Sequence, residues 1–424
     1  MWQVPAMRYS LPVLMVVLVV TATVTVGTPA LSPGTSSPVV DRGAVDAVAP
    51  IADAQNASNY LTLPDSGAER SQFGNATLDF GATVAVDSAN LQESLSTQTA
   101  IESFRTAPNT SAKTTALQRA AAVLENRTSA LFQRQQRSIR QFNDGRISTE
   151  LLFRRLAETD ARARAISSSA VEIQRTAENT GGYVIPFDLS SRFNNVEQRT
   201  TLLYTDLRGN IGASLAGTRD SRRYLVSASN NAFVVAGGTQ GQFVRETYID
   251  SQFQRGGSDR FNGDLGDAIE YVYDLYPWAE ANQRPPYSDI DTVVGSLYQV
   301  TINHKHGRLL TYLDGSNGEI FFEIQENRLS TLPTTETATA ENESADLSVR
   351  ANLTYPTGPM ELAVRNTAAD TPADARISVD GQFVGRTGSD GRLWTVQSEA
   401  TTQIEAVAGD DRVSFTVTNV AAGR

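Results

Sequence analysis

The 424-residue sequence contains no cysteine, only two lysines and only two histidines. Without cysteine the chain has no disulfides, so ordinary hydrophobic cores must hold it together. Lys113 and Lys305 are the two lysines, and arginine supplies the other basic residues. Acidic residues outnumber basic residues by 47 to 36, which gives a formal charge of −11. This balance argues against nucleic-acid binding, because that function needs a basic face.

The shortage of lysine also indicates the solvent in which the protein works. Arginine has a weakly hydrated, forked side chain that pairs well with carboxylates, whereas the lysine ammonium is strongly hydrated. In concentrated salt, screening removes the cost of self-repulsion between many like charges. An excess of carboxylates with very few lysines is therefore typical of a halophilic protein.

The N-terminus has the features of an export signal. Residues 1–10 contain one basic residue, Arg8, and no acid, residues 11–26 carry no charge, and small residues follow. The apolar run is slightly short for a membrane-spanning helix of about 20 residues and slightly long for a signal core of about 7–15 residues. A cleaved signal peptide and an uncleaved transmembrane anchor both fit. In either case we expect the chain after about residue 30 to be secreted or to lie at the outer face of the cell membrane.

Six Asn-x-Ser/Thr sequences support export, because such sites can carry N-linked glycans in exported proteins. None has proline at the middle position. They begin at Asn56, Asn75, Asn109, Asn126, Asn342 and Asn352. We therefore predict an extracellular glycoprotein.

Composition and periodicity predict a multidomain α+β fold. The expected parts are a signal peptide or membrane anchor (1–28), a flexible tether (29–60), an antiparallel helical hairpin domain (61–182), a central α+β domain with an antiparallel sheet (183–331), a solvated linker (332–345) and a small β-sandwich (346–424).

A short helix before Pro108 and two long helices after it are expected in the region 61–182. The two long helices share one pattern. Their apolar residues recur at alternating steps of four and three, which is the spacing of a coiled-coil seam. The turn at 143–145 joins them into an antiparallel hairpin, which could also pair with a second copy of itself. The seam residues are Leu117, Ala121, Leu124, Thr128, Leu131, Ile139 and Phe142 in one helix, and Leu152, Leu156, Thr159, Ala163, Ile166, Ala170, Ile173 and Ala177 in the other.

The central and C-terminal regions contain short runs with strand character. A helix with one apolar face is expected at 264–280. In the C-terminal region, a hairpin turns at Asp380-Gly381, and turn signals about ten residues apart indicate a sandwich. The strands expected in the central region are 224–228, 233–236, 243–249, 297–302, 307–313 and 319–324.

Three resemblances follow from these segments. The strand pair 300–302 and 307–310, with the turn 313–320, resembles a PepSY-type unit, a small extracytoplasmic module regarded as a regulatory partner of proteases. The segments 375–387 and 390–393 resemble carboxypeptidase-regulatory-like sandwich domains, which are accessory and non-catalytic. The complete layout, with its scarcity of lysine, resembles uncharacterised surface proteins of haloarchaea.

Candidate catalytic and metal-binding groups are few. His304 and His306 share one face of a strand but have no third ligand beside them, so an exposed turn is the better interpretation. Ser214 lies in a sequence near the nucleophile elbow of hydrolases, but Ala216 stands where glycine is needed. Four acids follow one another along the helix at 264–280, where a solvated face is expected: Asp264, Asp267, Glu270 and Asp274.

Three glycine- or aspartate-rich turns could bind a phosphate or a cation by composition alone. The segment 237–241 lacks the Lys-Ser/Thr ending of a phosphate-binding loop and favours a hairpin. The turns at 314–319 and at Asp390 lack the ligand spacing of a dedicated calcium loop.

The sequence therefore predicts no catalytic residue, no cofactor and no metal site. It favours a non-enzymatic extracytoplasmic surface protein with an interaction or cell-envelope role. The alternatives are a PepSY-like regulator of an extracytoplasmic protease and, third, a hydrolase. The expected partners are proteins or a second copy, and the membrane if residues 11–26 are retained.

Overall fold

The computed structural model describes residues 51–52, 59–64 and 68–418, apart from positions 230, 240, 255, 294, 335 and 400 and the segment 343–345. The export segment at 11–26, most of the expected tether and the Asn56 sequon lie outside the described residues. Within the part of the chain that the structure describes, no helix is both long enough and apolar enough to cross a membrane.

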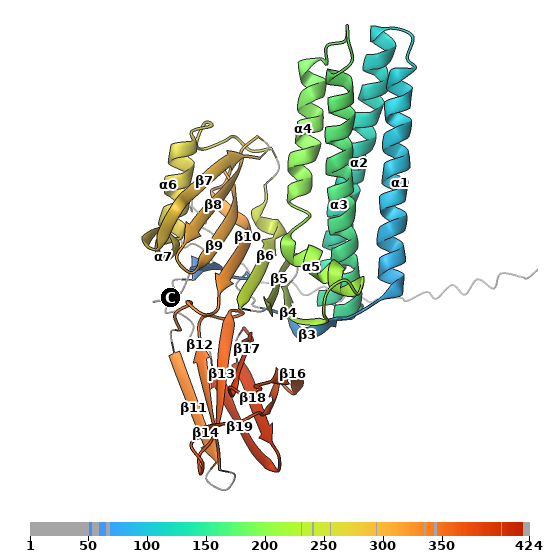
Figure 1. The fold of residues 1–424 in the computed structure, drawn as a ribbon. Coiled ribbons are helices and arrows are strands. Elements are labelled where there is room, and N and C mark those ends of the chain that lie inside the picture. The colour runs from blue at the N-terminus through green and yellow to red at the C-terminus, as the bar shows by residue number, and fades with distance from the viewer. Residues whose placement is uncertain are drawn as a thin grey trace, which may run out of the picture. The chain divides into compact units, whose positions relative to one another are not determined.

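Five α-helices form a helical layer (Figure 1). Each of the first three begins at a side chain that accepts a backbone N–H bond of the first turn, and these caps are Asp79, Asn109 and Ser148. The helices are α1 (Phe80–Arg105), α2 (Thr110–Asn143), α3 (Thr149–Glu178), α4 (Phe187–Thr201) and α5 (Asp206–Leu215).

The predicted seams of α2 and α3 are confirmed, because every residue assigned to them is buried. The seams are part of a larger layer, since α4 and α5 pack on the same core through Phe193, Val196, Leu207 and Ile211. The helical layer therefore continues to residue 215, into the region expected to start the α+β domain. A two-helix hairpin leaves too much apolar surface uncovered, and α1, α4 and α5 cover it.

The central sheet is antiparallel and has eight strands in the order β3-β4-β5-β6-β10-β9-β8-β7. Two of its strands were not expected: β3 lies inside the region assigned to the hairpin, and β7 contains Pro285 and Pro286, which an edge strand tolerates. The bounds are β3 (Arg70–Ala76), β4 (Arg222–Ser229), β5 (Ala232–Thr239), β6 (Gln242–Ile249), β7 (Gln283–Thr292), β8 (Leu297–His304), β9 (Gly307–Asp314) and β10 (Glu319–Arg328).

Both faces of this sheet are buried. One face packs on the helical layer through Val226, Phe233 and Tyr248. The other face packs on α6 (Leu265–Leu275) and α7 (Pro277–Ala281), and the strand β2 (Tyr60–Leu61) joins the same cluster. Strand β2 pairs with β1 (Ile51–Ala52). Burial on both sides explains why these strands read as nearly continuous apolar runs.

The C-terminal region is a sandwich of two antiparallel sheets around one apolar core. One sheet contains β11, β12, β13, β14 and β17, and the other has the order β16-β15-β18-β19. Strand β11 lies in the segment expected to be a linker. The strands are β11 (Glu336–Asn342), β12 (Leu347–Leu353), β13 (Pro359–Asn366), β14 (Thr371–Pro372), β15 (Arg376–Val379), β16 (Gln382–Arg386), β17 (Arg392–Val396), β18 (Thr401–Ala408) and β19 (Asp411–Thr418).

Candidate functional site

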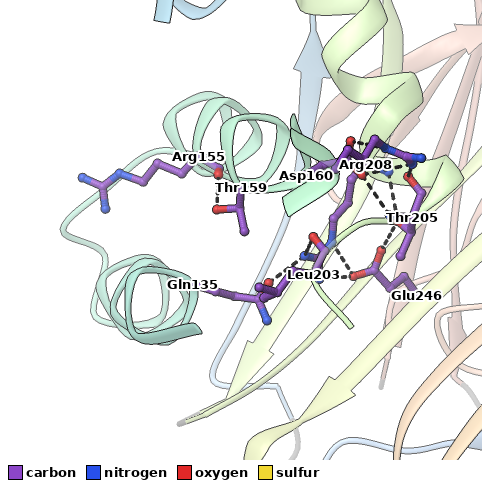
Figure 2. A network of polar contacts seen from close by, with 9 residues as sticks. Gln135, Arg155, Thr159, Asp160, Leu203, Thr205, Arg208 and Glu246 are labelled. Carbon is purple, nitrogen blue, oxygen red and sulfur yellow. Dashed lines mark hydrogen bonds and ion pairs between the residues drawn. The ribbon is translucent and has the colours of Figure 1, made fainter. Parts of the chain in front are cut away.

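A buried ion pair joins the helical layer to the central sheet (Figure 2). Arg208 of α5 and Glu246 of β6 are 1% and 0% exposed. The Arg208 Nε donates to Glu246 Oε1 at 2.8 Å, and the hydroxyl of Thr205 donates to Glu246 Oε2 at 2.7 Å. Arg208 also donates to the side chain of Gln135 on α2 at 2.6 Å and to the carbonyl of Leu203 at 2.8 Å. Partners on three elements thus satisfy both charges.

The network continues to α3 through Asp160. Its Oδ1 accepts from the backbone N–H of Thr205 at 2.9 Å, and its Oδ2 accepts from Arg164 Nε at 3.0 Å. Burial raises the pKa of the Asp160 carboxyl, and the Arg164 guanidinium opposes that shift. These polar contacts thereby link helices α2, α3 and α5 to one another and to strand β6.

A second buried ion pair lies on the opposite face of the sheet. Arg245, the neighbour of Glu246 in β6, donates from NH1 to Glu323 Oε1 of β10 at 2.9 Å. Glu323 Oε2 accepts from the N–H of Leu61 at 2.7 Å and from the hydroxyl of Tyr276 at 2.8 Å. Burial raises the pKa of both the Glu323 carboxyl and the Tyr276 phenol. Because successive side chains of a strand point to opposite faces of the sheet, the neighbours Arg245 and Glu246 place one ion pair on each face.

This second network also reaches the sandwich. Arg245 Nε donates to the hydroxyl of Thr357 at 3.0 Å, and the hydroxyl of Tyr355 donates to Gln325 Oε1 at 2.8 Å. The Tyr355 ring stacks on Tyr60 at 4.5 Å between centroids. Strand β2, the sheet, the α6–α7 junction and the sandwich therefore meet in one buried, hydrogen-bonded cluster, which suits a structural joint.

The structure does not bring the candidate hydrolase residues together. The Ser214 hydroxyl donates to the carbonyl of Asp220 at 2.9 Å on the helical side of the sheet. His304, only 1% exposed, belongs to the opposite face, where it lies against Trp278 at 5.2 Å between centroids. The expectation of an exposed turn was wrong for His304, because Trp278 of α7 covers it. Among the described residues no group of three or more metal-ligating side chains is found.

Two of the remaining candidate acids, Asp264 and Asp314, have local structural partners, whereas Asp267, Glu270 and Asp274 lie exposed on α6. Asp264 caps α6 by accepting from the N–H groups of Gly266 and Asp267. Asp314 is buried, and its two carboxylate oxygens accept from Gln254 and Ser316 at 2.6–2.9 Å. These contacts give the Asp314 carboxylate a structural role in its turn. Segment 237–239 ends β5 and leads into the β5–β6 hairpin, as predicted.

Of the sequons, Asn109 and Asn126 present exposed side chains on the helical layer. Asn75 lies exposed on β3, where it accepts from Arg223 Nε at 2.8 Å. Asn352 is half-buried and donates to Glu361 at 2.8 Å. Their glycosylation stays a prediction.

Most of the large apolar side chains that are exposed in the described part of the chain lie on the helical layer, which also holds three concave surfaces. A groove of about 670 Å³ lies between α1 and α2, and its lining is mostly alanine, serine and threonine. Two smaller cavities, of about 180 and 230 Å³, also lie against α1. The outer side of α1 exposes four large apolar side chains, Phe80, Val84, Leu91 and Leu95. Their steps of four, seven and four are a helical signal, but the sequence did not identify them as a surface feature, because such spacing ordinarily marks a core face.

Three family models match the chain. A domain of unknown function (DUF7096) matches residues 7–220, a family of unknown function (DUF7094) matches residues 224–333, and an archaeal fibronectin-III type-like domain matches residues 336–415. No curated protein and no solved structure matches. The boundary between the first two models falls between α5 and β4, where the chain passes from the helices into the sheet. None of the three is a PepSY or carboxypeptidase-regulatory-like model, so those two resemblances stay predictions.

Proposed function

Because the chain belongs to the family described as a domain of unknown function (DUF7096), we propose a role from its own structure. The protein is a non-enzymatic extracytoplasmic protein that acts by binding protein surfaces through its helical layer. The sheet and the archaeal fibronectin-III type-like sandwich support that layer.

One observation carries this proposal, the position of the exposed apolar side chains. Among the described residues, ten large apolar side chains are exposed, and eight of them lie on the helical layer or at its ends. A contiguous apolar patch on a strongly charged protein surface marks an interaction site, and four of the eight residues gather on one side of α1. The eight are Leu78, Phe80, Val84, Leu91, Leu95, Val123, Val184 and Phe187.

The buried charges support the same proposal. The guanidinium groups of Arg208 and Arg245 are held by Glu246 and Glu323 inside the protein. Catalytic acids and bases need access to a substrate, and these pairs are at most 1% exposed. Their arrangement suits a rigid scaffold better than a reaction centre.

Photo-cross-linking in intact cells tests the proposal. A photoreactive amino acid is placed at Leu91 of α1 or at Phe187 at the start of α4, and in the control at Asp267, which is exposed on α6. We expect cross-linked protein from the two helical-layer positions and little from Asp267. Cross-links from Asp267 alone would refute a binding role for the helical layer.

A second candidate function is regulation of an extracytoplasmic protease through the central sheet. It is favoured by the antiparallel strands β8, β9 and β10, which contain the segments of the PepSY resemblance, with the turn 315–318 between β9 and β10. Under this proposal the Asp267 position would cross-link to a protease.

A further inference from the structure

The outer face of α1 carries an apolar stripe of two residue pairs, one on each side of Asp87 and Ser88. Phe80, Val84, Leu91 and Leu95 are 76%, 64%, 63% and 60% exposed. At about 100° per residue, their spacing places all four within an arc of about 60° on the helix. We refer to these four residues as the α1 stripe. It faces away from the side on which α1 contacts α2 and α3.

The first five turns of α1 place their larger apolar side chains outside. The residues buried against the bundle there are Ala82, Ala89, Glu93 and Thr97. All three cavities described above lie on this inner side and include residues of α1. A helix of a bundle normally has the reverse arrangement, with its large apolar side chains toward the core. The α1 stripe is therefore available to a surface outside this copy of the chain.

The stripe is symmetric about its own midpoint. The midpoint lies between Asp87 and Ser88. Phe80 and Leu95 are equally far from it along the chain, and so are Val84 and Leu91. A twofold dimer requires that residue i contacts residue j and that j contacts i. Two antiparallel copies of α1 centred at that point meet this requirement with apolar partners at each level.

Charge on this segment is also low. Between residues 80 and 95 the charged residues are Asp87 and Glu93. Glu93 points inward, where Arg127 NH1 donates to both of its oxygens at 2.9 Å. Asp87 is thus the one charge exposed on this stretch of α1, at the edge of the stripe. Helix surfaces that stay in water usually carry more charge, and depletion of charge is a property of interface cores.

We propose that the α1 stripe is the interface of a twofold-symmetric dimer of this chain, with the two α1 helices packed antiparallel. Phe80 contacts Leu95 of the partner subunit, and Val84 contacts the partner's Leu91. The inference deepens the proposed function, on which it rests for the helical layer as the binding element. It names the partner as a second copy of the chain.

The geometry predicts a specific effect of salt. The two copies of Asp87 lie near the twofold axis on the same side of the helix pair, because antiparallel symmetry brings equivalent edges together. Their repulsion opposes the dimer and is screened at high ionic strength. Dimerisation should therefore strengthen as salt rises, and Asp87→Asn should strengthen it at low salt.

Cysteine cross-linking tests the register, and the absence of native cysteine makes each introduced thiol the sole reporter. In the proposed dimer, the two copies of position 80 are about 22 Å apart along the helices, whereas position 80 faces position 95. A short bis-maleimide should therefore not link Phe80→Cys to itself. It should link a mixture of Phe80→Cys and Leu95→Cys. Ser88→Cys, next to the axis, should link to itself, and the exposed α6 control Asp267→Cys should not.

Sedimentation equilibrium gives the second measurement. Leu91→Asp should weaken the dimer more than about tenfold, because the substitution removes an apolar contact in each half of the interface. Leu91 is 63% exposed, so the fold should survive, and circular dichroism checks this. Self-linking of Phe80→Cys would overturn the antiparallel register. A monomer with no cross-link in the mixture would overturn the dimer.

The two proposals fail differently. If the purified protein is a monomer but Leu91 cross-links to another protein in intact cells, the dimer is refuted and the interaction role stands. If Leu91 and Phe187 yield no cross-link to any protein, including a second copy, the proposed function itself is refuted.

Discussion

The free energy of unfolding should decrease as the pH falls, because one imidazole, that of His304, is buried in its neutral form. The ring is 1% exposed, and Trp278 lies edge-on to it at 5.2 Å. Among the described groups its Nδ1 has no hydrogen-bond partner. Burial lowers the pKa of His304 from 6.5 to about 4, and the neighbouring His306 adds to the shift. The folded protein therefore holds this imidazole in its neutral form.

The sign and size of the effect follow from proton linkage. Between pH 6.5 and about 4 the unfolded chain binds a proton at this position that the folded chain does not. Stability is therefore complete above the unfolded pKa and declines as the pH falls toward 4. From pH 7.5 to pH 5 the loss from this group is about 2 kcal/mol, and its steepest contribution approaches about 1.4 kcal/mol per pH unit.

Urea denaturation at fixed ionic strength, followed by tryptophan fluorescence, measures this term. Wild type is compared with His304→Gln, which cannot titrate. The free energy of unfolding of the variant should depend less on pH by about 2 kcal/mol over that range. His306→Gln is the matched control, because that ring is less buried. Parallel pH profiles for wild type and His304→Gln would refute the reasoning.

Three further stability predictions concern the buried pair, a close backbone approach and the helical core. In urea denaturation, Glu246→Ala should lower the free energy of unfolding by about 3–5 kcal/mol, because it leaves Arg208 buried without its partner. Replacing both residues by leucine should lower it by less. Equal losses for the two variants would contradict this prediction. Gly237→Val should destabilise the protein by more than about 1 kcal/mol in thermal unfolding, because an added Cβ would lie 2.3 Å from the ring of Tyr224. The control Gly181→Ala has no such neighbour and should be nearly neutral. Leu156→Ala should cost about 2–5 kcal/mol, and a loss below 1 kcal/mol would show that its site is not packed as described.

Periodicity predicted the helices well where one face is buried over many turns. The seams of α2 and α3 and the cap at Ser148 follow from local patterns, because a side chain every three or four residues must face the same neighbour. The hairpin turn at Asp380 and Gly381 was predictable for a similar reason, since both residues adopt positive φ there.

Local patterns could not predict strand β3. Its sequence is polar, and its place is set by pairing with β4, about 150 residues away in the chain. The Arg70 NH1 also donates to the carbonyls of Phe142 and Ile147 in the α2–α3 turn. Such contacts depend on distant segments, so no window around β3 contains the signal.

The features of the candidate site were likewise predictable from the sequence only in part. The sequence alone showed that catalytic pairs built on histidine or cysteine are scarce, because only two histidines and no cysteine are present. It could not show that Arg245 and Glu246 each find a carboxylate or guanidinium partner on opposite faces of the sheet. It also could not separate an exposed apolar stripe on α1 from a buried one, because the spacing is identical.

The sequence by itself determined the composition-dependent properties of this protein: the acidic charge, the dependence on hydrophobic cores without disulfides, and the amphipathic seams of α2 and α3. These properties are set by residue type and by spacing along one element. The tertiary structure decided the order of the eight strands, the partners of the buried charges and the exposure of the α1 stripe. These depend on which distant surfaces meet, and burial is a property of the folded chain as a whole.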